Sequence, residues 1–183
     1  AIARSVVIAK VANCRTVLLR AARERSQGDG AKALAFAADH MAGLLRQLDG
    51  ALTLETVRGI EGEAARAYFG VFDHLIVVQK GGFFFRERSR RPPMDNMNAL
   101  LSFLYTILAH DVQSALESVG LDPQVGYLHR DRPGRPGLAL DLMEEFRPIM
   151  ADRLVLSLVN RQQVTPDGME TTESGAVFMN EHT

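Results

Sequence analysis

Apolar residues recur at every third or fourth position along most of this sequence, and no other feature constrains the fold as strongly. In the segment 2–25 this spacing gives an apolar stripe of Val7, Val11, Cys14 and Leu18. Comparable stripes predict helices over about 32–48 and, opening near Thr53, over a segment that fades at Gly81–Gly82. Helices with one apolar face bury it against one another, so the sequence predicts a mainly α, multi-helical domain.

The most apolar of the expected helices covers about 96–119, with Asp95 as its N-cap. It is apolar nearly all round between Ala99 and Ala109, a stretch far shorter than the ~20 residues that cross a bilayer. We therefore expect this helix to be the central, buried helix of the domain.

Proline and turn residues divide the rest of the chain. Pro148 should kink or split a last helical region over about 138–159, because proline lacks a helical N–H and clashes with the preceding turn. After Thr165, turn residues leave room only for a small C-terminal β-hairpin built from the segments 169–172 and 176–179.

Length and composition are those of an ordinary globular domain. The 183 residues, 46% hydrophobic and 23% charged, suit a single domain over 1–183 that does not span a membrane. The one cysteine, Cys14, excludes an internal disulfide and fits a reducing cytoplasm. Because Cys14 lies on an apolar stripe, we expect a buried, inert thiol.

The net charge of the chain and the distribution of its charges lead to different expectations about a nucleic-acid partner. A net charge of −1 argues at first against a nucleic-acid partner. However, the segment 165–183 holds four acids and no lysine or arginine, so the segment 1–164 carries a net +3. The basic residues are 18 Arg against 3 Lys, which reflects either bidentate phosphate binding or a bias of genome composition.

Glu61 is the first candidate for a functional site. It lies between Gly59 and Gly62 in an expected helix, where each glycine costs about 1 kcal/mol relative to alanine. Its spacing puts the carboxylate at the edge of an apolar face, where a lone charge is unfavourable. Either this carboxylate has a function, or the helix breaks at Gly59, or Glu61 pairs with Arg58.

Three acids, Asp141, Glu144 and Glu145, follow on one face of the last helical region. At spacings of three and four residues like charges repel, and a divalent cation would turn this repulsion into a binding site. Acids in the first turns of a helix are also stabilised by its macrodipole, so a purely structural explanation stays open.

A histidine and seven arginines complete the candidate set. His129 lies in a loop of glycine, proline and arginine, where a histidine is often merely solvated. Arginines crowd that loop and one other at a density suited to a polyphosphate backbone. They are Arg86, Arg88, Arg90, Arg91, Arg130, Arg132 and Arg135. Carboxylates, an imidazole and arginine loops together fit a phosphodiesterase that uses Mg²⁺ or Mn²⁺.

Four segments around these residues resemble a known family. They read GIEGEAARAYF (59–69), RERSRRPPMDNMNALLSFLYTIL (86–108), GLDPQVGYLH (120–129) and LALDLMEEFRP (138–148). In order and spacing they resemble the C-terminal catalytic domain of the CRISPR-associated endonuclease and integrase of spacer acquisition, an almost wholly helical, metal-dependent enzyme. The resemblance covers nearly the whole chain, from about Val7 to Asn160.

The resemblance implies a set of site residues. Glu61, His129 and Glu144 match the three catalytic metal ligands of the family, with Mg²⁺ or Mn²⁺ as cofactor. Asp141 matches an acid beside them and is the candidate for a further ligand, whereas Glu145 matches none.

Further residues are implied to act around that site. Lys10 and Asn13 resemble a K-x-x-N feature near the family's site, and DNA contact or support of the site is their expected role. The seven arginines of the two loops are expected to bind DNA.

For the reaction, the resemblance implies cleavage and joining of phosphodiester bonds, by which new spacers enter a CRISPR array in prokaryotic antiviral defence. Its setting would be the prokaryotic cytoplasm, and its substrates the spacer precursor and the CRISPR repeat. A full-length member forms a homodimer and binds the small second CRISPR-associated protein.

A complete member begins with a small β-rich domain that nothing here resembles, so we expect an isolated catalytic domain. Two other classes stay open. One is a catalytically silent helical DNA-binding module; the other is an all-α interaction domain without DNA or metal.

Overall fold

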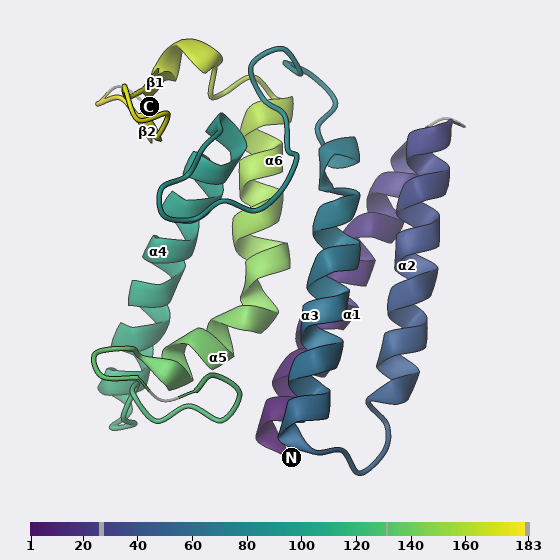
Figure 1. Cartoon of the computed structure of the whole chain (residues 1–183), viewed down its shortest axis with the longest axis vertical. Coiled ribbons are helices and arrows are strands. Elements are labelled where there is room, and N and C mark those ends of the chain that lie inside the picture. The colour runs from purple at the N-terminus through teal and green to yellow at the C-terminus, as the bar shows by residue number, and fades with distance from the viewer. Residues whose placement is uncertain (26–27, 131, 182–183) are drawn as a thin grey trace.

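The computed structural model describes residues 1–25, 28–130 and 132–181, and its helices form two groups that pack side by side (Figure 1). The first group contains α1 (Ile2–Glu24), α2 (Asp29–Gln47) and α3 (Leu54–Gly70). The second contains α4 (Asn96–Ser118), α5 (Gly137–Phe146) and α6 (Arg153–Asn160). The mainly α, multi-helical class predicted from the sequence is confirmed.

Short elements connect and close these groups. They are the 3₁₀ turns η1 (Phe72–Leu75) and η3 (Pro166–Gly168), the π-helical turn η2 (Arg147–Asp152), and the strands β1 (Met169–Thr171) and β2 (Val177–Met179). The two strands pair antiparallel, with Met169 opposite Met179, so the expected C-terminal hairpin is confirmed.

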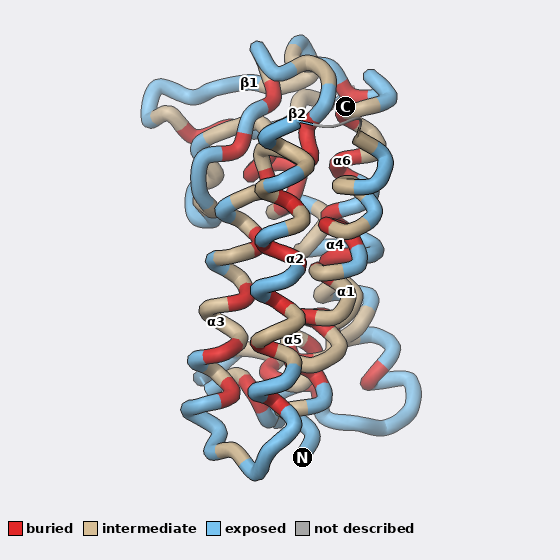
Figure 2. Tube along the Cα trace, turned by 90° about the vertical axis from the view of Figure 1, so that its right-hand side faces the viewer, coloured by how far each residue is buried: buried red, intermediate tan, exposed pale blue. Residues whose placement is uncertain are grey.

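The helix at the centre of the fold is α1. It packs against α2 and α3 on one side and against α5 and η2 on the other, and thereby joins the two groups. Val7, Val11 and Leu18, which form the apolar stripe seen in the sequence, are fully buried. Buried residues follow the inward sides of the helices, and the exposed residues gather on their outer sides and in the end loops (Figure 2).

The expectation that the helix over 96–119 would be the central one is wrong. α4 packs on one side only, against α5, η2, α6 and β2, and leaves Phe103 48% and Ile107 41% exposed. Apolar residues on every face of this helix therefore do not show that every face is buried, because exposed apolar side chains are common on protein surfaces. Within the described ranges α4 alone is long and apolar enough to cross a membrane, which is weak evidence because core helices pass the same test.

Pro148 divides the last helical region as its chemistry requires. α5 ends at Phe146, the π-helical turn η2 carries Pro148 in its first turn, and α6 begins at Arg153. α5 and α6 meet at a clear angle in Figure 1. The wider π-helical turn accommodates Pro148, which has no main-chain N–H to donate. The bend at this turn directs α5 toward α1.

The N-cap of α4 allows a test of the fold. Asp95 accepts a hydrogen bond from the Asn98 main-chain N–H at 2.7 Å and another from the Asn98 side-chain amide at 2.6 Å. Asp95→Ala should lower the free energy of unfolding by about 1–2 kcal/mol in urea denaturation. Asp111→Ala, at an exposed position inside the same helix, is the control and should change it by less than about 0.5 kcal/mol. Equal losses in the two variants would contradict the role of the cap.

Candidate functional site

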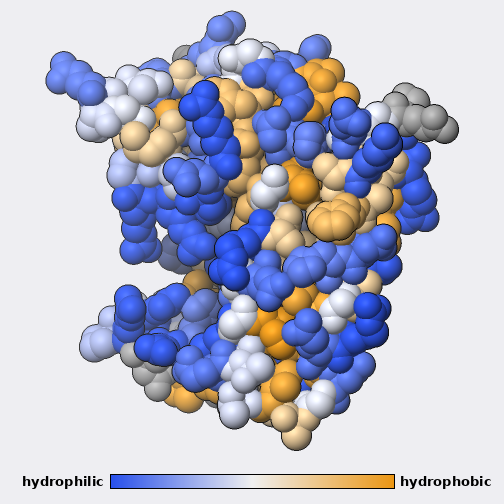
Figure 3. All heavy atoms as spheres, turned by 45° about the vertical axis from the view of Figure 1, so that its right-hand side comes forward, coloured by the Kyte–Doolittle hydropathy of each residue, from blue (hydrophilic) through white to orange (hydrophobic). Residues whose placement is uncertain are grey.

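A pocket lies where α3 of the first helix group faces α5 and the loop before it. Its lining includes the three predicted metal ligands, Glu61, His129 and Glu144. Four arginines complete the polar part of the lining: Arg58, Arg130, Arg132 and Arg135. Figure 3 shows a largely hydrophilic face that is hollowed on one side between two hydrophilic lobes.

Glu144 is the most deeply placed of the three candidate ligands. Its side chain is only 3% exposed, and Arg147 donates a 2.7 Å hydrogen bond to Oε1. Oε2 lies 2.6 Å from the Lys10 ammonium but, among the described residues, takes part in no hydrogen bond of acceptable geometry. Burial alone would raise the pKa of Glu144, but the charges of Arg147 and Lys10 outweigh it and lower the pKa.

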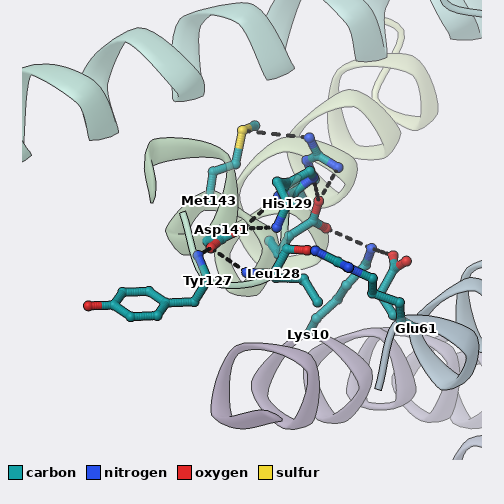
Figure 4. Close-up of polar contacts among 10 residues, drawn as sticks. Lys10, Glu61, Tyr127, Leu128, His129, Asp141 and Met143 are labelled. Carbon is teal, nitrogen blue, oxygen red and sulfur yellow. Dashed lines mark hydrogen bonds and ion pairs between the residues drawn. The ribbon is translucent and has the colours of Figure 1, made fainter. Parts of the chain in front are cut away.

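Lys10 connects Glu144 to Glu61. Its ammonium, from α1, contacts Glu61 Oε1 (Figure 4). The same ammonium also contacts Glu144 Oε2, so it lies between the two carboxylates. Burial favours the neutral amine, but the two negative charges are stronger and raise the pKa of Lys10. The site therefore holds a partly buried ion cluster with a cation at its centre.

Glu61 is placed by an uninterrupted helix. α3 runs continuously from Leu54 to Gly70, so the alternative of a break at Gly59 is wrong. The alternative pairing with Arg58 is also wrong, because that guanidinium binds Glu55 and donates to the Leu128 carbonyl, each at 2.7 Å.

Asp141 fixes the loop that carries His129. One carboxylate oxygen accepts from the main-chain N–H groups of Tyr127 and Leu128, and the other accepts from the His129 main chain and pairs with its Nδ1 at 2.6 Å. These contacts outweigh burial and lower the pKa of Asp141. A carboxylate has about four lone-pair sites, and all four are used here. The geometry thus suits Asp141 to orienting His129 rather than to binding a metal.

Two glycines allow the loop to approach α5. A Cβ on Gly126 would lie 2.8 Å from the main-chain carbon of Gly137, and a Cβ on Gly137 would lie 2.8 Å from the Gln124 carbonyl oxygen. The Leu138 N–H also donates to the Pro123 carbonyl at 2.9 Å. This close backbone packing brings His129 to the face of α5 that carries the acids.

The donor set suits a divalent cation, although the side chains do not converge on one. In the parts of the chain that the structure describes, no three His, Cys, Asp or Glu side chains surround a common point. His129 Nε2 lies 3.8 Å from Glu144 Oε1, and Lys10 stands between the carboxylates. Two carboxylates, an imidazole and the buried Glu144 Oε2 without a hydrogen bond still match the ligand types of Mn²⁺ or Mg²⁺.

The arginines proposed for DNA fall into three sets. Arg130, Arg132 and Arg135 line the pocket, and Arg130 is 70% exposed. Exposed positions in the other loop are held by Arg86, Arg90 and Arg91.

The assignment of Arg88 to DNA binding is not supported. This half-buried guanidinium donates to the side chains of Asn98 and Ser102 and lies 5.2 Å above the Tyr105 ring. Nη1 and Nη2 thus both donate within the protein, and these contacts anchor the loop of Arg88 on α4.

Asn13 and Glu145 are held by one contact. The Asn13 amide donates to the Glu145 main-chain carbonyl at 2.8 Å and ties α1 to α5. Of the two roles expected for Asn13, support of the site therefore fits the geometry. The Cys14 thiol next to it is buried, as expected, and burial raises its pKa well above the ordinary range.

Three residues behind the site were missed from the sequence. The Tyr105 hydroxyl donates a 2.5 Å hydrogen bond to buried Asp152, and the Arg147 guanidinium lies 4.9 Å above the Tyr105 ring. Arg147 thus connects Tyr105 and Asp152 to Glu144. Its position three residues after Glu144 is a spacing that could have indicated the pair.

A model of one family matches the entire chain: CRISPR associated protein Cas1 matches residues 1–183. The chain belongs to the Cas1 family. A CRISPR-associated endonuclease Cas1 of Rhodospirillum rubrum is 56% identical over 182 residues, 97% of this chain and 53% of the relative. Another, of Chlorobaculum tepidum, is 52% identical over 178 residues, 97% of this chain and 52% of the relative.

Solved Cas1 structures and a casposase share the fold. A chain of a Cas6-RT-Cas1–Cas2 complex matches 99% of this chain and 19% of its own length, with a TM-score of 0.84 and 27% identity. A casposase bound to its integration product matches 99% of this chain and 48% of its own, with a TM-score of 0.80 and 26% identity. The chain spans about half the length of the curated Cas1 relatives that it matches.

Asp152 gives the stability of this Cas1 domain a specific pH dependence. Burial raises the pKa of its carboxyl from an ordinary value near 4 to about 6, and the hydrogen bond from Tyr105 offsets only part of this rise. Between pH 4 and pH 6 the folded protein binds more protons at Asp152 than the unfolded chain, so this residue lowers stability as the pH rises.

Asp152→Asn cannot titrate and should remove this loss. Relative to the unsubstituted protein, the variant should gain about 1–3 kcal/mol in free energy of unfolding between pH 4 and pH 7, measured in urea. Asp111→Asn, at an exposed position, is the control. A constant difference between variant and parent at both pH values would refute the role of Asp152.

Proposed function

We propose that this chain is the catalytic part of a divalent-metal-dependent DNA endonuclease and integrase, which cuts and joins phosphodiester bonds to insert new spacers into a CRISPR array. One observation carries the proposal: Glu61, His129 and Glu144 come from three separate elements and line one pocket, together with four arginines. The relatives named CRISPR-associated endonuclease Cas1 and the similarity to a casposase bound to its integration product support it.

Glu61, Glu144 and Nε2 of His129 would hold the cation, Mn²⁺ or Mg²⁺. Hard carboxylate oxygens suit both ions, and the imidazole favours Mn²⁺. When bound, the ion supplies a Lewis acid for a phosphoryl oxygen and lowers the pKa of an attacking water or 3′-hydroxyl.

The neighbouring residues prepare the ligands for this role. The Asp141 carboxylate accepts a hydrogen bond from Nδ1 of His129, so the free lone pair of the imidazole is on Nε2 and faces the pocket. Arg147 keeps Glu144 ionised and holds Oε1 in place.

Arginines would position the DNA backbone around this centre. Arg130, Arg132 and Arg135 at the pocket, with Arg58, bind phosphates next to the scissile bond. The exposed Arg86, Arg90 and Arg91 bind the backbone farther along the strand.

The partners follow from the relatives. A structure with a matching chain is a Cas6-RT-Cas1–Cas2 complex. This complex supports a full-length protein that binds Cas2. The homodimer, the prokaryotic cytoplasm, and a spacer precursor and CRISPR repeat as substrates are part of the proposal through the family resemblance alone.

The metal-dependent reaction is tested with Glu61→Gln. This variant keeps the shape of the side chain but removes its charge, so Mn²⁺-dependent nicking of supercoiled DNA should fall by at least about 100-fold. Glu63→Gln, two residues along the same helix, is the matched control and should retain the parent rate. An unchanged rate in Glu61→Gln would overturn the assignment and favour a silent DNA-binding module.

The orienting role of Asp141 has a separate test. Asp141→Asn should weaken Mn²⁺ binding by about 10–100-fold in calorimetric titration, because the amide no longer fixes the ring orientation and tautomer of His129. Asp122→Asn, in the same loop, should bind Mn²⁺ like the parent. Loss of binding in both variants would show that any disturbance of the loop is sufficient and would refute a specific role of Asp141.

A further inference from the structure

We propose that the Lys10 ammonium is the resident cation of the metal-free protein: it holds the Glu61 and Glu144 carboxylates together and gives up this place when a divalent cation binds. The inference rests on the metal site proposed above and adds a competitor that sets the affinity of that site. It makes Lys10 part of the metal equilibrium, not a residue for DNA contact.

The position of the ammonium carries the argument. Lys10 Nζ contacts Glu61 Oε1 and lies 2.6 Å from Glu144 Oε2, so it stands between the two carboxylates that would bind a metal (Figure 4). A Mg²⁺ ion takes carboxylate oxygens at about 2.0–2.1 Å. An ion at that distance from both oxygens would need the volume that the ammonium fills.

Charge explains why a cation is needed there at all times. Glu61 comes from α3 and Glu144 from α5, and the latter side chain is only 3% exposed. The Glu61 side chain is 26% exposed, so only Glu144 is shielded from water, but the two carboxylates still repel unless a positive charge separates them. Lys10, with a side chain 11% exposed, is delivered from α1 into this gap.

The two carboxylate oxygens of Glu144 have different partners. Arg147 donates a hydrogen bond to Oε1 and belongs to the same helical region, so that contact is structural. Oε2 meets Lys10 as an ion contact but accepts no hydrogen bond of acceptable geometry from any described residue. When Lys10 leaves, the hydrogen bond that it donates to Glu61 Oε1 breaks, and the charge of the incoming divalent ion must offset that loss.

The chemistry of a lysine side chain also allows an exchange. A lysine ammonium is a compact charge on a flexible four-carbon stem, unlike the planar fork of Arg147, which also stacks on Tyr105. The structure thus places one exchangeable and one fixed cation on the same buried carboxylate.

The experiment compares Mn²⁺ binding in the parent protein, Lys10→Met and Lys32→Met. Lys32 is an exposed lysine whose ammonium lies 3.9 Å from the exposed Asp29 carboxylate, so its variant is the control for net charge. Mn²⁺ affinity is measured by calorimetry and by the electron paramagnetic resonance signal of the free ion. Melting temperatures are recorded with and without Mn²⁺.

Lys10→Met should bind one Mn²⁺ at least about tenfold more tightly than the parent protein. Without metal it should melt at a lower temperature than the parent, and Mn²⁺ should raise its melting temperature by more. Lys32→Met should match the parent in each measurement. If Lys10→Met does not fold, Lys10→Gln, which is neutral but polar, should show the same tighter binding.

The outcomes separate this inference from the proposed function. Equal or weaker Mn²⁺ binding in both Lys10 variants, with a parent protein that binds, overturns the competition and leaves the metal site standing. Failure of the parent and of both Lys10 variants to bind Mn²⁺ overturns the metal site, and the inference with it. Tighter binding in Lys32→Met as well would assign the effect to net charge and overturn the role of Lys10.

Discussion

The Asp141 carboxylate is the interaction on which the arrangement of the site depends. The described residues of the loop between α4 and α5 form no regular secondary structure around His129, and three successive main-chain N–H groups donate to this one side chain. Hydrogen bonds to a charged carboxylate are stronger than those to a neutral acceptor. The single buried carboxylate of Asp141 therefore satisfies the main-chain N–H groups that, in a strand or helix, would bond to other main-chain carbonyls. The same group orients the His129 imidazole, so the path of the loop and the direction of this side chain have one cause.

Charge compensation around Glu144 is the second constraint. A buried carboxylate without partners is costly, and this one is met by Arg147 from its own helical region and by Lys10 from α1. Arg147 in turn lies over Tyr105, whose hydroxyl binds Asp152 in the π-helical turn. The bend at Pro148 therefore has a role in the site, because it sets the angle between α5 and the cluster that supports Arg147.

Local signals in the sequence predicted most of the helices, the N-cap at Asp95 and the break at Pro148, because periodicity, side-chain caps and proline act over a few residues. The third helix ends at Gly70, well before the expected Gly81–Gly82. The membership of Glu61, His129 and Glu144 in one pocket came from the family resemblance, and the structure does bring them together. The ion pair of Lys10 with Glu61, 51 residues apart, could not be predicted, since no local rule links α1 to α3. The exterior place of α4 was mispredicted because hydrophobicity does not say which side of a helix finds a neighbour.

The two helix groups each contribute part of the site: Glu61 and Lys10 belong to the first, and Glu144 with the loop of His129 to the second. Binding at the pocket is therefore thermodynamically linked to the packing of one group against the other. A ligand that bridges Glu61 and Glu144 stabilises this internal interface by its own binding free energy. Conversely, a core substitution between α1 and α5 that loosens the interface weakens the site even though it lies outside the pocket.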